Sequence, residues 1–185
     1  MKAAEILRKY RAGTRIFSGI DAVGISLSSA QLSQTNFSQA ILTEVDFSQA
    51  NLIEANFHLA LLSLSNLSEA VLTSANLKSA TLTSALLYKA SCGAVQLQNA
   101  NLEGAILKRA FVREANLNGA NLKSVDLSQA NLIDADLSGA DLSGANLDRT
   151  FLQGANLTNA KLNRIDLERA VLTGATMPNG RIFDV

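Results

Sequence analysis

Leucine and phenylalanine recur at every fifth residue along almost the whole chain. Of the 33 positions with this spacing between residues 17 and 177, 25 are Leu and four are Phe. Two residues earlier, Ala fills 23 of the 33 corresponding positions, and the position between them is Asn or Asp in 17. The repeating unit is therefore A-(N/D)-L-x-x.

A period of five residues fits neither an α-helix nor a β-strand. Side chains return to one face after about 3.6 residues in a helix and at every second residue in a strand, so neither element buries the Ala and Leu of every unit. The chain must turn a corner in each unit. If each unit forms one side of a square coil, Leu and the preceding Ala point inward. Ala suits the corner because bulky groups would not fit there in every layer.

The spacing of three phenylalanines indicates the length of one coil. Phe17, Phe37 and Phe57 follow one another at intervals of four repeating units, so a coil of four units would stack their rings on one inner face. At the spacing of paired strands, about 4.8 Å, roughly eight such coils make a rod on the order of 40 Å long.

The unit A-(N/D)-L-x-x, held over residues 15–180, resembles the pentapeptide repeat family. This resemblance implies an all-β fold, a right-handed quadrilateral parallel β-helix with four of the five-residue units in each coil. The stretch EILRKYRAGTRIFSG resembles the N-terminal element of cyanobacterial members. The sequence MPNG at 177–180 is similar to their MPDG-type ending.

The two ends depart from the repeat, so we expect three segments: a capping helix at 1–14, the β-helix at 15–180 and a tail at 181–185. Ile6, Leu7 and Tyr10 fall on one face of the predicted helix, and Gly13 is a suitable stop. The short tail is a poor cap. The sequence therefore predicts a last coil that is partly open, or that forms a weak homodimer with a second copy.

The balance of charge argues against a partner of strong charge. Sixteen basic residues match sixteen acidic ones, which indicates neither a direct nucleic-acid binder nor a strongly acidic protein. A single cysteine makes no internal disulfide and fits a reducing compartment. No apolar stretch suits a secretory signal or a membrane span. We expect a cytoplasmic protein that binds neither nucleic acid nor membrane directly.

Residues that commonly carry chemistry are few. His58, the only histidine, follows an inward position and should face solvent, and Cys92 takes an inward leucine position, where it should act as a small apolar core residue. No nucleotide-binding or hydrolase motif occurs, and a rod of this kind is expected to offer no cleft. We therefore expect no catalytic, cofactor-binding or metal-binding residue, no cofactor and no enzymatic activity.

One side of the predicted coil carries apolar residues at outward positions. They are Val71, Phe111, Ile133, Phe151 and Val171. Basic residues precede them along one edge: Lys89, Arg109, Arg149 and Arg169. An apolar stripe beside arginines is typical of a protein interface, so these nine are the candidate interaction residues. The alternative is neutral variation at loosely constrained positions, with arginine stems covering the rings.

The segment LLYKASCGAV at 86–95 matches the repeat least well. Leu86, Cys92 and Gly93 depart from the consensus there. The sequence leaves open a locally irregular coil or a recognition feature.

The leading functional hypothesis is a non-enzymatic structural or interaction protein that presents a rod-shaped surface to a protein partner of unknown identity, with regulation as one option. The family also includes quinolone-resistance proteins that mimic DNA and bind gyrase, which is the alternative. Those relatives are acidic and dimerise through a C-terminal helix, whereas this chain has no net charge. Another group regulates heterocyst differentiation by binding proteins, and both ends of this chain resemble that lineage.

Overall fold

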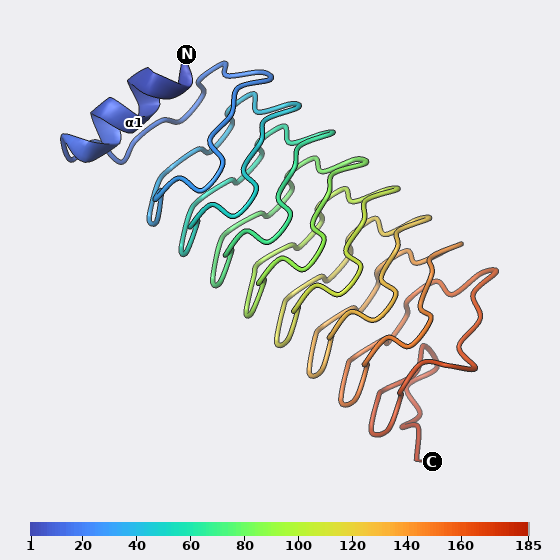
Figure 1. Cartoon of the computed structure of the whole chain (residues 1–185). Helices are drawn as coiled ribbons and strands as arrows, with labels where there is room; N and C mark the ends of the chain where they lie inside the picture. Colours follow the sequence, from blue (N-terminus) through green and yellow to red (C-terminus); the bar gives the residue numbers. More distant parts are fainter. Residues whose placement is uncertain (185) are drawn as a thin grey trace.

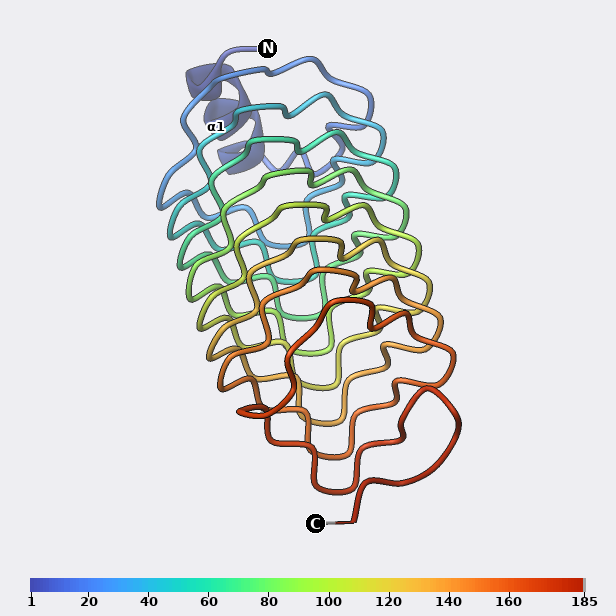
Figure 2. The ribbon, with the colours of Figure 1, turned by 90° about the vertical axis from the view of Figure 1, so that its right-hand side faces the viewer.

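The computed structural model describes residues 1–184. One helix, α1 (Ala3–Arg11), precedes a rod of stacked coils (Figure 1). Isolated parallel bridges join residues at equivalent places in successive coils, from Ile16–Asn36 to Asn156–Thr176. Viewed after a 90° turn, the coils lie in register along most of the rod (Figure 2). The predicted coil of four units is therefore confirmed, with single bridges in place of long strands because the chain turns in every unit.

The interior holds the leucine and alanine positions of the repeat. Every residue at the leucine position from 27 to 157 is at most 2% exposed. The predicted phenylalanine stack is confirmed, since the ring centroid of Phe37 lies 5.7 Å from that of Phe17 and 5.4 Å from that of Phe57. Phe47 comes from the opposite side of the coil and meets the rings of Phe37 and Phe57 edge-on at 6.0 and 5.9 Å. Its contribution was not foreseen from the spacing.

A β-turn closes each unit. The backbone N–H of Ala40, for example, donates to the carbonyl oxygen of Phe37 at 3.1 Å. From Gly19 to Arg164 the last residue of every unit has a positive φ, which is the signature of a type II turn. Glycine adopts this conformation without strain, and the glycines of the segment 139–146 occupy this position, with φ of 67° at Gly139 and 72° at Gly144.

The preference for Asn or Asp follows from the backbone hydrogen bonds. Over the five residues 36–40, which span one period of the repeat, four of the five N–H groups donate to backbone oxygens. The remaining N–H, that of Ser38, donates to the side-chain Oδ1 of Asn36 at 2.9 Å. Asn and Asp side chains commonly accept such a bond from the residue two positions on. Where the residue before the leucine is Asn or Asp, its side chain therefore satisfies the one N–H that the coils leave unpaired.

Helix α1 covers the first coil. Ile6 is fully buried, and Leu7 and Tyr10 pack against the core beside it. The Tyr10 hydroxyl donates to the carbonyl oxygen of Ser33 at 3.1 Å. Gly13, with a φ of 95°, follows the helix end. The predicted N-terminal helix is confirmed.

The last coil leaves the stack after Asn163, whose carbonyl oxygen still accepts from Gly144, and returns to it at Val171, whose N–H donates to Thr150 (Figure 1). Within the described chain no bridge joins Asn146 to Asp166, although each earlier coil has one at this place. Leu162 and Leu167 are only partly buried. The physical cause is that no further coil holds this part of the chain down.

The tail folds back over this end. Phe183 packs on the core, and its backbone N–H donates to the carbonyl oxygen of Ala175 at 2.8 Å. Part of the last layer stays uncovered, while pairing with a second copy stays a prediction. Val185, the last residue of the predicted tail, lies outside the described residues.

The segment 86–95 is regular. Leu86 is bridged to Ile106 and Ser91 to Phe111, and Lys89 and Ala94 have the usual positive φ. The irregular coil that the sequence left open is therefore excluded, since Cys92 fits the leucine position and Gly93 lies at a turn position that takes any residue.

Candidate functional site

Phe111 and Phe151 lie on the same outer side of the rod, two coils apart. Both are bridged to Asn131, which lies between them. Their side chains are 57% and 42% exposed, respectively. Because the backbone on either side of each phenylalanine is held in the stack of coils, the two Cα positions are fixed relative to each other.

Five of the nine predicted residues border one open groove of about 720 Å³. They are Lys89, Arg109, Phe111, Arg149 and Phe151. The remaining lining residues are Glu69, Ala110, Gln129 and Asn131. The expectation that the rod offers no cleft was therefore wrong, because side chains projecting from successive coils wall off a hollow that the backbone pattern does not indicate.

The groove carries an excess of positive charge. Lys89, Arg109 and Arg149 make no ion pair with any side chain of residues 1–184. The single carboxylate of the lining, on Glu69, accepts a hydrogen bond from Gln49 at 3.2 Å. Uncompensated cations in a groove attract negatively charged partners.

Arg109 is held in place by its neighbours. Its Nε donates to Oε1 of Gln129 at 2.8 Å. A hydrogen bond from Arg109 also lowers the pKa of the Tyr88 hydroxyl, and the Lys89 ammonium lies 5.2 Å from the centroid of the Tyr88 ring. Neither Tyr88 nor Asn131 was among the interaction residues predicted from the sequence. Counting one coil along the chain from Phe111 would have found Asn131, whereas Tyr88 is marked only by its place directly before Lys89.

The other four predicted residues lie outside this groove. Arg169 instead pairs with Asp148, with Nη1 2.9 Å from Oδ1, where the last coil opens. Val171 lines a second groove at the C-terminal end, beside Met177 and Phe183. Val71 and Ile133 are half-buried and do not line the groove.

The two phenylalanines occupy a position where the fold favours Asn or Asp. The backbone N–H groups of Arg113 and Gln153, two residues on, consequently find no side-chain acceptor in the described part of the chain. A lost hydrogen bond of this kind costs about 1 kcal/mol. Because 16 of the 33 units lack Asn or Asp at this position, this cost does not distinguish Phe111 and Phe151 from neutral variation.

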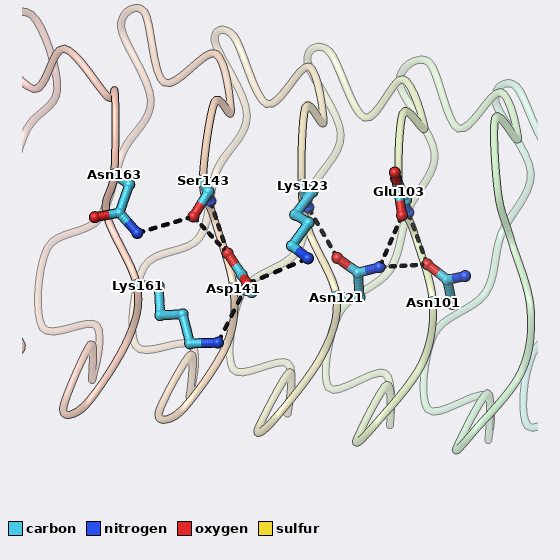
Figure 3. Close-up of polar contacts among 8 residues, drawn as sticks. All are labelled: Asn101, Glu103, Asn121, Lys123, Asp141, Ser143, Lys161 and Asn163. Carbon is cyan, nitrogen blue, oxygen red and sulfur yellow. Dashed lines mark hydrogen bonds and ion pairs between the residues drawn. The ribbon is translucent and has the colours of Figure 1, made fainter.

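A different side of the rod carries a ladder of polar side chains (Figure 3). The Asn121 amide donates to Oδ1 of Asn101 at 2.9 Å. Further along, Lys123 and Lys161 both lie within 4 Å of Asp141 Oδ2, at 3.6 and 3.4 Å. Here the charges are paired from coil to coil, in contrast to the groove.

The environments of His58 and Cys92, the other two residues considered for a chemical role, indicate that both are structural. Nδ1 of His58 lies 3.0 Å from the carbonyl oxygen of Lys78. Cys92 is buried, as predicted, and burial raises the pKa of its thiol to about 12. Across residues 1–184 no three His, Cys, Asp or Glu side chains gather as a metal site. No helix in that range is long and apolar enough to cross a membrane.

The chain forms a β-helical solenoid whose outer positions are free to vary. Its coils are bridged at intervals of four units, its interior is aliphatic, and side chains cap many of its turns. Residues 30–181 match the family model described as pentapeptide repeats, in eight copies. The chain belongs to the pentapeptide repeat family. Its fold is therefore the right-handed quadrilateral β-helix.

Solved structures agree with this assignment. HetL, a pentapeptide repeat protein involved in heterocyst differentiation regulation in the cyanobacterium Nostoc sp. strain PCC 7120, is 35% identical over 99% of this chain and 100% of its own, with a TM-score of 0.52. Trypsin-treated QnrB1, a plasmid-mediated fluoroquinolone resistance protein, is 22% identical over 90% of this chain and 86% of its own, with a TM-score of 0.78. The likeness to QnrB1 shows the fold alone. No curated protein sequence matches the chain.

Proposed function

We propose that this chain is a non-enzymatic, cytoplasmic interaction protein that presents its groove to a protein partner, in a regulatory role. The observation that carries the proposal is the juxtaposition of two exposed phenylalanine rings, Phe111 and Phe151, with three unpaired cations. Phenylalanine and arginine are enriched at protein interfaces, and arginine is among the residues that carry most of the binding energy. The likeness to HetL, a protein involved in regulation, supports the regulatory part.

The alternative of a DNA mimic that binds gyrase is less well supported. A mimic of the DNA backbone needs rows of negative charge, whereas the groove lining has three cations and one carboxylate. The chain as a whole has no net charge. A gyrase supercoiling assay tests this alternative, and strong inhibition by the purified protein would favour it over our proposal.

Affinity capture with paired variants tests the proposal. Phe111→Ser combined with Phe151→Ser should abolish capture of the partner from an extract of the native organism, with a melting temperature close to that of the unmodified protein. Leu64→Ser is the matched control, because Leu64 is 56% exposed on a different part of the rod. Its capture should be unchanged. Equal capture by the double variant would exclude the groove as the binding site.

A further inference from the structure

The geometry points to one class of partner: we propose that the groove binds an acidic amphipathic α-helix lying along the rod axis, with an apolar side chain between Phe111 and Phe151. This inference rests on the proposed function and names the partner that the groove fits. Three features carry it: the sign of the free charge, the spacing of the cations and the gap between the rings.

The sign of the free charge selects an acidic partner. Lys89, Arg109 and Arg149 form no ion pair within residues 1–184, and the one carboxylate of the lining, on Glu69, offsets only one of these three positive charges. On the opposite edge of the same side, Arg113 lies 3.4 Å from Asp134 and neutralises its charge. Complementary charge speeds association and selects partners. The cationic edge is thus the part of this side that a charged partner would recognise.

The spacing of the cations matches a helix. With coils about 4.8 Å apart, Arg109 lies about 4.8 Å and Arg149 about 14.4 Å along the axis from Lys89. In an α-helix, residues i+3 and i+10 lie about 4.5 and 15 Å from residue i along the helix axis. Acidic residues at i, i+3 and i+10 would therefore follow the spacing of the three cations. On one face of an extended strand the corresponding steps are about 6.7 and 13.4 Å. A helix matches both spacings from Lys89 to within about 0.6 Å and a strand only to within about 1.9 Å, so the spacing favours a helix.

The gap between the Phe111 and Phe151 rings also matches a position on the same helix. Phe111 follows Arg109 in its coil and Phe151 follows Arg149, so Asn131 marks the midpoint, about 9.6 Å along the axis from Lys89. Residue i+6 of the same helix lies about 9 Å along its axis, on the flank of the acidic residues. An apolar side chain there would insert between the rings above Asn131. Arg109 is already ordered by Gln129, which reduces the entropy lost on binding.

A designed peptide tests the inference directly. The probe is a fluorescein-labelled, alanine-based helical peptide with Glu at i, i+3 and i+10 and Leu at i+6. Three control peptides carry the same residues in permuted order, a central proline that breaks the helix, or Lys in place of each Glu. Fluorescence anisotropy with the full-length protein should show the probe binding at least tenfold more tightly than each control, and more weakly as salt increases.

Protein variants locate the binding. Arg109→Gln combined with Arg149→Gln should weaken probe binding at least tenfold, as should Phe111→Ser with Phe151→Ser. Lys108→Gln is the matched control, because it removes a neighbouring cation that does not line the groove, and it should change affinity less than twofold. Circular dichroism melts confirm that each variant is folded.

The outcomes separate this inference from the proposed function. Equal binding of the proline or permuted peptide, no probe binding, or binding insensitive to Arg109 and Arg149 would overturn the acidic helix. The proposed function would still stand if capture of the native partner depended on the two phenylalanines. If capture of the native partner did not depend on the two phenylalanines, the proposed function would be overturned, irrespective of the result with the peptide.

Discussion

The side-chain Oδ1 of Asn116 accepts a hydrogen bond of 3.1 Å from the backbone N–H of Asn118. Within residues 1–184 this N–H has no other partner, so the Asn116 side chain alone satisfies it. Asn116→Ala should therefore lower the free energy of unfolding by about 1 kcal/mol, as measured by urea denaturation. Asn116→Asp keeps the acceptor oxygen and should stay close to the unmodified protein. An equal loss in both variants would contradict this account of the Asn and Asp preference.

Two buried hydroxyls at alanine positions should have opposite effects on stability. The Oγ of Ser65 is fully buried without a hydrogen-bond partner in the described residues, whereas the Oγ1 of Thr150 donates to the carbonyl oxygen of Leu127 at 2.9 Å. Burying an unsatisfied hydroxyl costs about 1–3 kcal/mol. Ser65→Ala should raise the free energy of unfolding, and Thr150→Ala should lower it by about 1 kcal/mol or more. Urea denaturation that moved both variants in one direction would refute the distinction.

Cys92 should be unreactive in the folded protein. The thiolate is the form that reacts, and burial raises the pKa of this thiol to about 12. At pH 8 a disulfide reagent should label Cys92 at the rate at which the coil opens, and labelling should become fast in denaturing urea. Rapid labelling under native conditions would show that the coils around Cys92 open far more easily than their burial indicates.

The interior of this fold is almost wholly predictable from sequence, because each buried position recurs in every repeating unit. Phe37 and Phe57 stack because their four-unit spacing equals one coil. The same argument reaches the floor of the groove, since Phe111, Asn131 and Phe151 also follow one another at intervals of one coil.

The repeat does not encode features that depend on contacts between side chains of neighbouring coils or on the two ends of the rod. Arg169 falls in the same row as Arg149 in the sequence, yet it pairs with Asp148 where the last coil opens. The opening itself has little sequence signal, because Leu162 and Leu167 match the consensus. The groove likewise depends on how far long side chains such as Arg109 project, which the five-residue pattern leaves unspecified.

The pH dependence of stability should report on Asp141. A hydrogen bond of 2.6 Å from the Ser143 hydroxyl is the main cause that lowers the pKa of this carboxyl from its ordinary 3.8 to about 2, with the Lys123 and Lys161 ammonium groups contributing (Figure 3). Because the pKa is lower in the folded state, the stabilisation is complete above the ordinary value. It should be lost as the pH falls from about 4 to about 2.

Asp141→Asn isolates this contribution, since the amide can still accept the Ser143 hydrogen bond but carries no charge. The stability advantage of the unmodified protein over this variant should be constant above pH 5 or so and shrink between about pH 4 and pH 2, as followed by thermal melts. Ser143→Ala removes the main cause of the shift, so it should raise the folded-state pKa, and the loss should become smaller and end at a higher pH. An advantage that stayed constant down to pH 2 would show that Asp141 gains nothing from its charge.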